Sequence, residues 1–138
     1  MLSSDHENAK LLERIYSAVA GGDPATLDDA IDEPFVAHTI GHSPIGGTFV
    51  GLDAFKGHIA LLRALSGGTM KRKTIEFYAG DTWAVTPQVI TASRGGRDIQ
   101  IAVAGFWRFS GLGRIAEHWE AVSDVAAWDA FWQSPPEG

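Results

Sequence analysis

The amino-acid sequence predicts an α+β fold in which three helices come first and four antiparallel strands follow. In residues 7–31 and 53–65, apolar side chains recur every three or four residues, as on one face of a helix. From residue 71 onward, β-branched and aromatic residues dominate in segments separated by short connections that contain glycine. Such segregation of helices and strands along a chain favours α+β architecture over a parallel α/β sheet.

Two helices are predicted before residue 35. Ser4 and Glu7 have the spacing of a capping box at a helix start, and Gly21–Gly22 is a typical helix end. Asp23–Pro24 has the form of an N-cap followed by a first-turn proline, and Glu33–Pro34 is expected to stop the short second helix. The apolar positions of these helices are Leu11, Leu12, Ile15 and Val19, then Leu27, Ala30 and Ile31.

The later elements are placed by the same patterns. Phe35–His38 is followed by a loop rich in glycine and proline, and a third helix is expected from about Asp53 to Gly67–Gly68. The four predicted strands are 71–78, 82–93, 98–109 and 114–123.

Composition limits the classes of function. A chain of 138 residues is the size of one domain, so residues 1–138 are expected to form a single domain. The formal net charge of −6 disfavours nucleic acid as a partner, and the basic run Lys71–Lys73 is expected to be a solvated strand edge. The absence of cysteine excludes disulfides, thiol nucleophiles and cysteine-ligated zinc. With no visible signal peptide or membrane-length apolar stretch, a cytoplasmic protein without a membrane partner is expected.

The last predicted strand holds the clearest candidate chemistry. Alternation places His118 and Glu120 on one face, together with Ala116 and Val122. A histidine beside a carboxylate suits proton transfer where that face is buried, and is an ordinary surface pair where it is solvated. Periodicity alone leaves both possibilities open. The opposite face holds Ile115, Glu117, Trp119 and Ala121.

The other histidines stand in weaker patterns. His38 precedes a glycine-rich loop, and an isolated histidine is more often a structural hydrogen-bonding residue than a catalytic one. His42 follows four residues later, but its loop context disfavours a metal site, and no metal is predicted. His6 and His58 are expected on helix surfaces.

Five tryptophans in 138 residues are expected mainly to pack the core, with the lining of an apolar ligand pocket as the functional alternative. Trp83, Trp107 and Trp119 fall in predicted strands, whereas Trp128 and Trp132 fall in the C-terminal tail.

Four stretches of the chain occur in an order known from one protein family. Phe35–His38 forms a strand ending in histidine, and Gly51–Phe55 opens a helix after the following loop. Gly105–Phe109 and Gly113–Glu120 form a closing hairpin that ends in Glu-His-Trp-Glu. Together they resemble the SnoaL-like polyketide cyclases and ketosteroid isomerases of the nuclear transport factor two-like superfamily. The resemblance implies a strongly curved sheet and three helices that enclose a conical pocket.

The resemblance also implies which residues form the site. Glu120 matches the acid–base aspartate of the cyclases, and His38 matches the base aspartate of the isomerases. His38, His118 and Glu120 are therefore the implied catalytic residues and are expected to converge in one apolar pocket. The implied substrate-binding residues are Trp107, Trp83, Phe35, Phe55, Ile15, Ala116 and Val122.

Two positions depart from the isomerase pattern. Gly105 stands where the isomerase oxyanion hole has a protonated aspartate. Ile15 best matches the isomerase tyrosine of the first helix, and Tyr16 is one position away. Both oxyanion donors are then missing or displaced, so steroid isomerisation is disfavoured.

The functional expectation is an enzyme without cofactor that performs general acid–base catalysis on an apolar, carbonyl-containing small molecule. The resemblance favours aldol cyclisation, with isomerisation and dehydration as related reactions. A binding or assembly domain without chemistry is the main alternative. Epoxide hydrolysis needs an Asp-Arg-Asp constellation, and no such set around Arg108 is evident. A homodimer packed through the outer sheet face is expected from the family habit and the aromatic-rich sheet.

Overall fold

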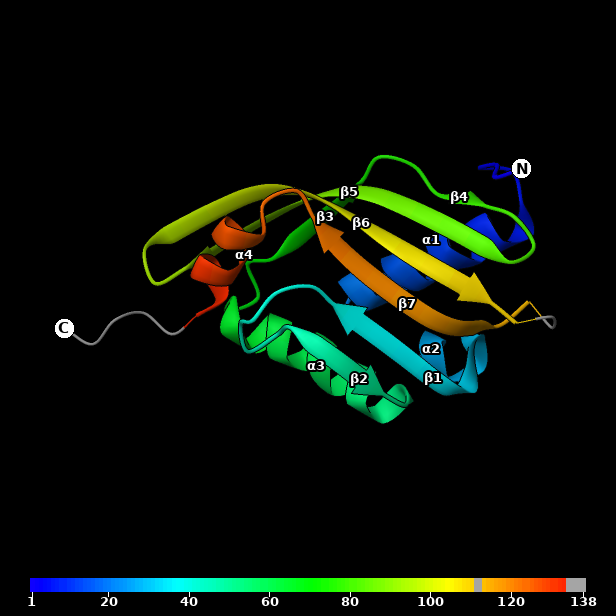
Figure 1. The fold of residues 1–138 in the computed structure, drawn as a ribbon, viewed down its shortest axis with the longest axis horizontal. Helices are drawn as coiled ribbons and strands as arrows, with labels where there is room; N and C mark the ends of the chain where they lie inside the picture. Colours follow the sequence, from blue (N-terminus) through cyan, green and yellow to red (C-terminus); the bar gives the residue numbers. More distant parts are fainter. Residues whose placement is uncertain (111–112, 134–138) are drawn as a thin grey trace.

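The computed structural model describes residues 1–110 and 113–133, and in them four helices pack on one curved sheet of seven strands (Figure 1). This arrangement confirms the predicted α+β class. The helices are α1 (Glu7–Ala20), α2 (Thr26–Ala30), α3 (Leu52–Leu65) and α4 (Val125–Trp132). The strands are β1 (Ile31–Thr39), β2 (Gly47–Val50), β3 (Lys71–Thr74), β4 (Tyr78–Ala79), β5 (Trp83–Arg94), β6 (Arg97–Phe109) and β7 (Ile115–Val122).

The strand order is β2-β1-β7-β6-β5-β3, and β4 pairs with β5 outside this path. The hairpins β5–β6 and β6–β7 are antiparallel, as predicted, but β1 pairs with β7 in parallel. The sheet is therefore mixed, and the prediction of a wholly antiparallel sheet is wrong at this pairing. Strands so far apart in the chain are joined by a long crossover, which permits the parallel direction that a hairpin forbids.

The N-terminal elements differ from prediction at their ends. His6, not Ser4, caps α1, and its Nδ1 accepts a hydrogen bond from the Asn8 backbone N–H at 3.0 Å. Ser3 pairs with Ala79 instead, which holds the first residues against β4. Pro34 does not end α2 but lies within β1, where the pairing with β7 is irregular and a missing N–H costs little.

Two elements are absent from the sequence prediction. Strand β2 lies in the segment expected to be a loop, and α4 lies in the segment expected to be a tail. Asp124 caps α4 through its Oδ1, which accepts from the Ala127 N–H at 3.0 Å. Trp128 and Trp132 are fully buried in this helix, so the tail tryptophans belong to the core. An N-cap residue followed by an apolar run is the signal that marks such a helix.

The buried side chains form two clusters. The first packs α1, α2 and α3 against the sheet, and the second packs α4 against the far ends of β5 and β6. Figure 1 shows α1 and α2 together on one face of the sheet, with α3 beside β2. In the described residues, no helix is long and apolar enough to cross a membrane.

Candidate functional site

A cavity of about 630 Å³ lies between α1, α3 and the covered face of the sheet. This volume is within the range of known ligand pockets, and its wall has the expected character, mainly apolar with a few convergent polar groups. The polar lining residues include Tyr16, His58, Arg72, His118 and Glu120.

Glu120 is the buried carboxylate among the described cavity-lining residues, and it is 5% exposed. Its Oε1 lies 2.5 Å from Arg72 Nη1, and its Oε2 lies 3.4 Å from Arg72 Nη2. Arg72 Nη1 also donates to Gln88 Oε1 at 2.9 Å. Burial alone would raise the pKa of the Glu120 carboxyl, but the charge and hydrogen bonds of Arg72 outweigh burial and lower it. Glu120 is therefore an ionised, weakly basic carboxylate.

The basic run Lys71–Lys73 was expected at a solvated strand edge, and this prediction is right for Lys71 and Lys73 but wrong for Arg72. Along β3 the side chains of Lys71 and Lys73 are exposed, whereas Arg72 turns to the inner face. Burial works against the charge of Arg72, yet Glu120 raises its pKa and keeps it a cation. Alternation within a three-residue basic run is the signal that separates the central arginine from its neighbours.

His118 lies beside Glu120 on the cavity face of β7, as alternation requires, and is 6% exposed. Its ring centroid is 4.0 Å from that of Trp107 and 5.7 Å from that of Phe55. Its Nδ1 is buried with no hydrogen-bond partner among the described residues. Burial lowers the pKa of His118 to about 3 despite the opposing charge of Glu120, so the imidazole is neutral at pH 7.

Tyr16 brings a hydroxyl to the same end of the cavity. The hydroxyl accepts from Trp107 Nε1–H at 3.2 Å and lies 2.9 Å from Thr86 Oγ1. Burial raises the pKa of Tyr16, so the hydroxyl stays protonated. Both Ile15, the expected match of the isomerase tyrosine, and Tyr16, one position away, reach the cavity wall, so α1 does supply a tyrosine hydroxyl to the cavity.

Gly105 makes this arrangement possible. A Cβ on residue 105 would lie 2.7 Å from Thr86 Oγ1, 3.0 Å from the Tyr16 hydroxyl oxygen and 3.3 Å from His118 Nε2. Three polar atoms therefore approach the backbone where other residues carry a side chain. The aspartate donor of the isomerase pattern is absent here, and tyrosine, threonine and histidine crowd that position instead.

His58 is a second buried histidine of the cavity, and its expected place on a helix surface is wrong. It is 5% exposed, and its ring lies 4.5 Å from Phe49 and 6.2 Å from Phe55. Burial lowers its pKa to about 4, and its Nδ1 has no hydrogen-bond partner among the described residues. Its spacing of three residues after Phe55 and four before Leu62 is the sequence signal for the buried face of α3.

His38 does not line the cavity, so the predicted convergence of His38, His118 and Glu120 in one pocket is wrong. In the parallel β1–β7 register, His38 pairs with Trp119 and not with His118, so it points to the other face of the sheet. Its Nε2 lies 2.7 Å from Glu117 Oε2, and its ring stacks on Trp119 at 5.5 Å. Hydrogen bonding by His38, then by Arg108, lowers the pKa of Glu117.

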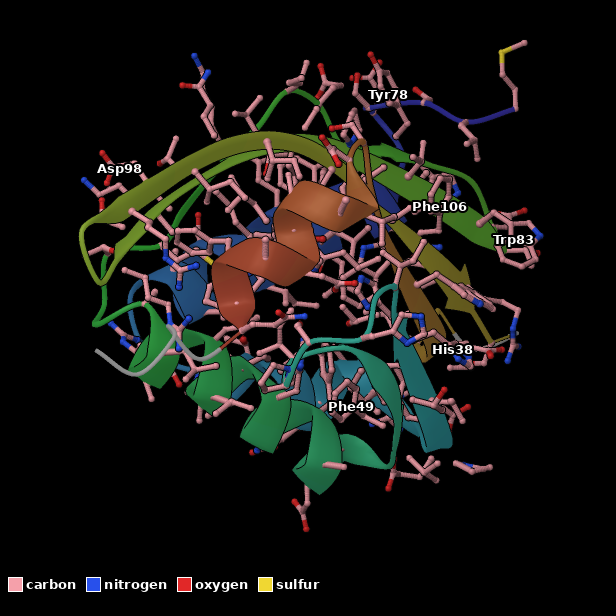
Figure 2. All side chains as sticks on the ribbon, turned by 60° about the vertical axis from the view of Figure 1, so that its left-hand side comes forward. His38, Phe49, Tyr78, Trp83, Asp98 and Phe106 are labelled. Atoms are coloured by element: carbon pink, nitrogen blue, oxygen red, sulfur yellow. The ribbon has the colours of Figure 1, made fainter. Side chains whose placement is uncertain are left out.

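The expected substrate-binding residues divide into four groups. Ile15, Phe55 and Trp107 line the cavity. Phe35 is fully buried behind Phe55, and Trp83 is half-exposed on the outer face, 5.8 Å from Trp119 (Figure 2). Two further residues of β7 lie outside the cavity lining, Ala116 and Val122.

Arg108, the arginine considered for epoxide chemistry, also lies on the outer face and donates to Glu117 Oε1 at 3.2 Å. Within residues 1–110 and 113–133, no three His, Asp or Glu side chains group as metal ligands would.

Comparison with known proteins finds one matching family model and several solved structures of similar fold. A family model described as "SnoaL-like domain" matches residues 12–118. Bal32a, from a soil-derived mobile gene cassette, is 30% identical with a TM-score of 0.87, covering 95% of this chain and 100% of its own. IdmH of Streptomyces antibioticus, a candidate polyketide cyclase, is 21% identical with a TM-score of 0.70, covering 88% of this chain and 97% of its own. TerC, co-crystallised with polyporic acid, is 17% identical with a TM-score of 0.78, covering 92% and 98%. A search of curated protein sequences found no match.

Proposed function

This chain belongs to the SnoaL-like domain family, and from that premise we propose that its cavity is the active site of a cofactor-independent acid–base enzyme. The substrate is an apolar small molecule with a carbonyl group, and the reaction is a cyclisation or isomerisation. The observation that carries the proposal is the buried Glu120 carboxylate beside a neutral His118 and the Tyr16 hydroxyl, all lining one mainly apolar cavity. The naming of IdmH as a candidate polyketide cyclase supports this class of reaction.

In the proposed mechanism, Glu120 removes a proton from the carbon next to the substrate carbonyl. The electron pair of the broken C–H bond moves onto the carbonyl oxygen, where the Tyr16 O–H and a neutral His118 N–H hydrogen-bond the growing negative charge. In a cyclisation, the enolate carbon then attacks a second carbonyl of the same molecule, and the alkoxide that forms takes the proton from Glu120. In an isomerisation, the enolate is conjugated with a C=C bond, and its far carbon takes the proton from Glu120. Either step returns Glu120 to the carboxylate. Because Arg72 lowers the basicity of Glu120, the carbon acid must itself be activated or its enolate strongly stabilised.

Proton exchange tests this mechanism without knowledge of the natural substrate. The bicyclic ketone 2-tetralone is incubated with the protein in deuterated buffer, and loss of the α-proton NMR signals gives the exchange rate. We expect Glu120→Gln to lower the catalysed rate by about 10²- to 10⁴-fold, the usual contribution of a general base. Glu117→Gln, on the opposite face of β7, is the matched control and should leave the rate unchanged. Equal rates in wild type and Glu120→Gln would remove Glu120 as the base.

A binding domain without chemistry is the second candidate, and one observation favours it. Both Glu120 oxygens face Arg72, an ion pair that stabilises the carboxylate and weakens it as a base. Saturable binding of 2-tetralone with no exchange above the buffer rate would support this candidate. Epoxide hydrolysis fits less well, because Glu120 is the one carboxylate paired with Arg72 among the described residues.

We also propose that the outer sheet face forms a homodimer. Phe106 and Trp119 are cross-strand neighbours, Trp83 lies against Trp119, and Trp83 and Phe106 are 49% and 41% exposed. Figure 2 shows Trp83 and Phe106 on the same side of the molecule. Sedimentation should give a dimer for wild type and a 14.8 kDa monomer for Phe106→Arg. The proposal is contradicted if wild type remains a monomer at a concentration where a dimer with an interface of standard size would form.

A further inference from the structure

Two buried imidazoles in the cavity have unused hydrogen-bonding capacity. The Nδ1 atoms of His58 and His118 are both buried without a hydrogen-bond partner among the described residues. No hydrogen bond joins either ring to a described residue, although both rings line the cavity. An unsatisfied buried polar group costs about 1–3 kcal/mol, so two in one wall need an explanation beyond packing.

Packing does not explain His58. The residue stands on the buried face of α3 between Phe55 and Leu62, where an apolar side chain fills the same space without a polar atom. Phe49, tilted by 38° with its ring centroid 4.5 Å away, and Phe55, parallel within 16° at 6.2 Å, restrict the plane of the His58 ring, so its nitrogens have a defined direction. The nearby carboxylate of Glu120 is already paired with Arg72, and His58 forms no ion pair with any residue of 1–110 or 113–133.

We propose that His58 is a ligand-binding residue that acts together with His118, so that the ligand carries at least two separate oxygen-bearing groups on a flat apolar frame. Each neutral imidazole has one N–H donor and one acceptor nitrogen, which matches a hydroxyl or a carbonyl group. Beside the two histidines, the charges of Arg72 and Glu120 compensate each other, so a neutral group fits better there than an ion. The other charged lining residues, Glu13, Arg63 and Lys71, are exposed. Aromatic walls from Tyr16 and Trp107 favour a flat frame.

This inference rests on the proposed function only in requiring that the cavity binds a small molecule. It does not require that the bound molecule reacts. It adds a residue from α3 to the site, on a different element from β7, which carries His118 and Glu120.

Histidine ¹⁵N NMR with two matched probes tests the inference. The probes are 2,7-dihydroxynaphthalene, which has two hydroxyls on a flat frame, and naphthalene, which has the frame alone. With the diol, the imidazole nitrogen signals of both His58 and His118 should shift. The other three histidines, His6, His38 and His42, lie outside the cavity lining and serve as internal references.

Substitution gives the second measurement. His58→Phe keeps an aromatic ring but removes both nitrogens, and it should weaken diol binding about 3- to 10-fold, the value of one neutral hydrogen bond. Naphthalene affinity should stay the same in this variant. His38→Phe, on the other face of the sheet, should change neither affinity.

The outcomes separate the two proposals. If both probes bind but His58→Phe keeps the wild-type preference for the diol, or the His58 nitrogens do not shift, the His58 inference is wrong and the proposed function stands. If neither probe binds, the cavity is not a site for flat apolar ligands and both proposals fail. The wild-type NMR result decides the matter even if His58→Phe does not fold.

Discussion

Each face of β7 carries a glutamate with a histidine and an arginine nearby, but the two sets differ in burial and in hydrogen bonding. On the outer face, Glu117 is bonded to His38 and to Arg108, and its side chain is 23% exposed. On the inner face, Glu120 is bonded to Arg72 and is nearly fully buried, while His118 keeps an unpartnered nitrogen. The outer set is partly exposed and its members are hydrogen-bonded to one another, and each exposed ion pair of this kind contributes about 1 kcal/mol or less to stability. The comparison shows that burial and unused hydrogen-bonding capacity, not residue type, distinguish a candidate site from an ordinary ion pair.

The two faces should differ most in the unfolding free energy that is lost when the arginine of each face is substituted. Arg72→Met leaves the Glu120 charge buried without its partner, and loss of one member of a buried pair costs roughly 3 kcal/mol of unfolding free energy. Arg108→Met removes a partly exposed pair and should cost less than about 1 kcal/mol. Urea unfolding at pH 7 measures both.

A second variant makes this comparison sharper. Adding Glu120→Gln to Arg72→Met removes the orphaned charge and should restore part of the lost stability. If Arg72→Met and Arg108→Met destabilise equally, the inner pair is solvated and the contrast between the faces is wrong.

The next expected difference is in how the stability of the fold changes at acidic pH. Folded His58 stays neutral down to its pKa of about 4, whereas in the unfolded chain it takes up a proton below about 6.5. The unfolded state therefore binds more protons in this window, and stability falls as the pH falls from 6.5 to 4, by roughly 3 kcal/mol for His58. Burial of His118, with its pKa of about 3, adds to the loss in the same direction.

His58→Phe should consequently show a shallower loss of stability between pH 6.5 and 4 than wild type. Phe55→Leu, a neighbouring change without a titrating group, should keep the wild-type slope while lowering stability at every pH. Chemical unfolding at half-unit pH steps gives the slopes. Identical slopes in wild type and His58→Phe would mean that water reaches His58 in the folded protein.

The smallest expected effect tests crowding on the inner face. Gly105→Ala places a methyl group 2.7 Å from Thr86 Oγ1 and 3.0 Å from the Tyr16 oxygen, so these groups must move. We expect a destabilisation of about 1–2 kcal/mol, as for other overpacked interiors, and slower 2-tetralone exchange. Gly57→Ala in α3 has no atom within 4 Å of the new Cβ and should instead stabilise by about 0.5–1 kcal/mol. An unchanged exchange rate in Gly105→Ala would show that Tyr16 does not act in the reaction.

Part of this site was predictable without coordinates. Alternation alone placed His118 and Glu120 together, and the resemblance turned that face inward, where both now lie. The same resemblance placed His38 in the pocket, and it failed because the β1–β7 register pairs His38 with Trp119. A register between strands so far apart in the chain leaves no local pattern, since either face of β1 alternates equally well.

Arg72 and His58 were also missed, for a related reason. Each has a local pattern that identifies its face: the middle of a basic run on a strand, and the spacing of Phe55, His58 and Leu62 on a helix. The prediction placed both residues at the surface because charged and imidazole side chains are mostly found there. It gave less weight to their spacing. Only a partner such as Glu120, supplied from a distant strand, stabilises the charge of Arg72 inside.

The amino-acid sequence by itself determined the local features of this protein: the α+β order, the glycine at position 105, and the neighbouring pair of His118 and Glu120 on one face of β7. These follow from backbone periodicity and from side-chain size, which act over a few residues. Tertiary structure alone decided which face is covered, that β1 runs parallel to β7, and that Arg72 meets Glu120 while His38 meets Glu117. Those contacts join segments that are 48 and 79 residues apart, so they depend on how the whole sheet curves and packs, and not on any local pattern.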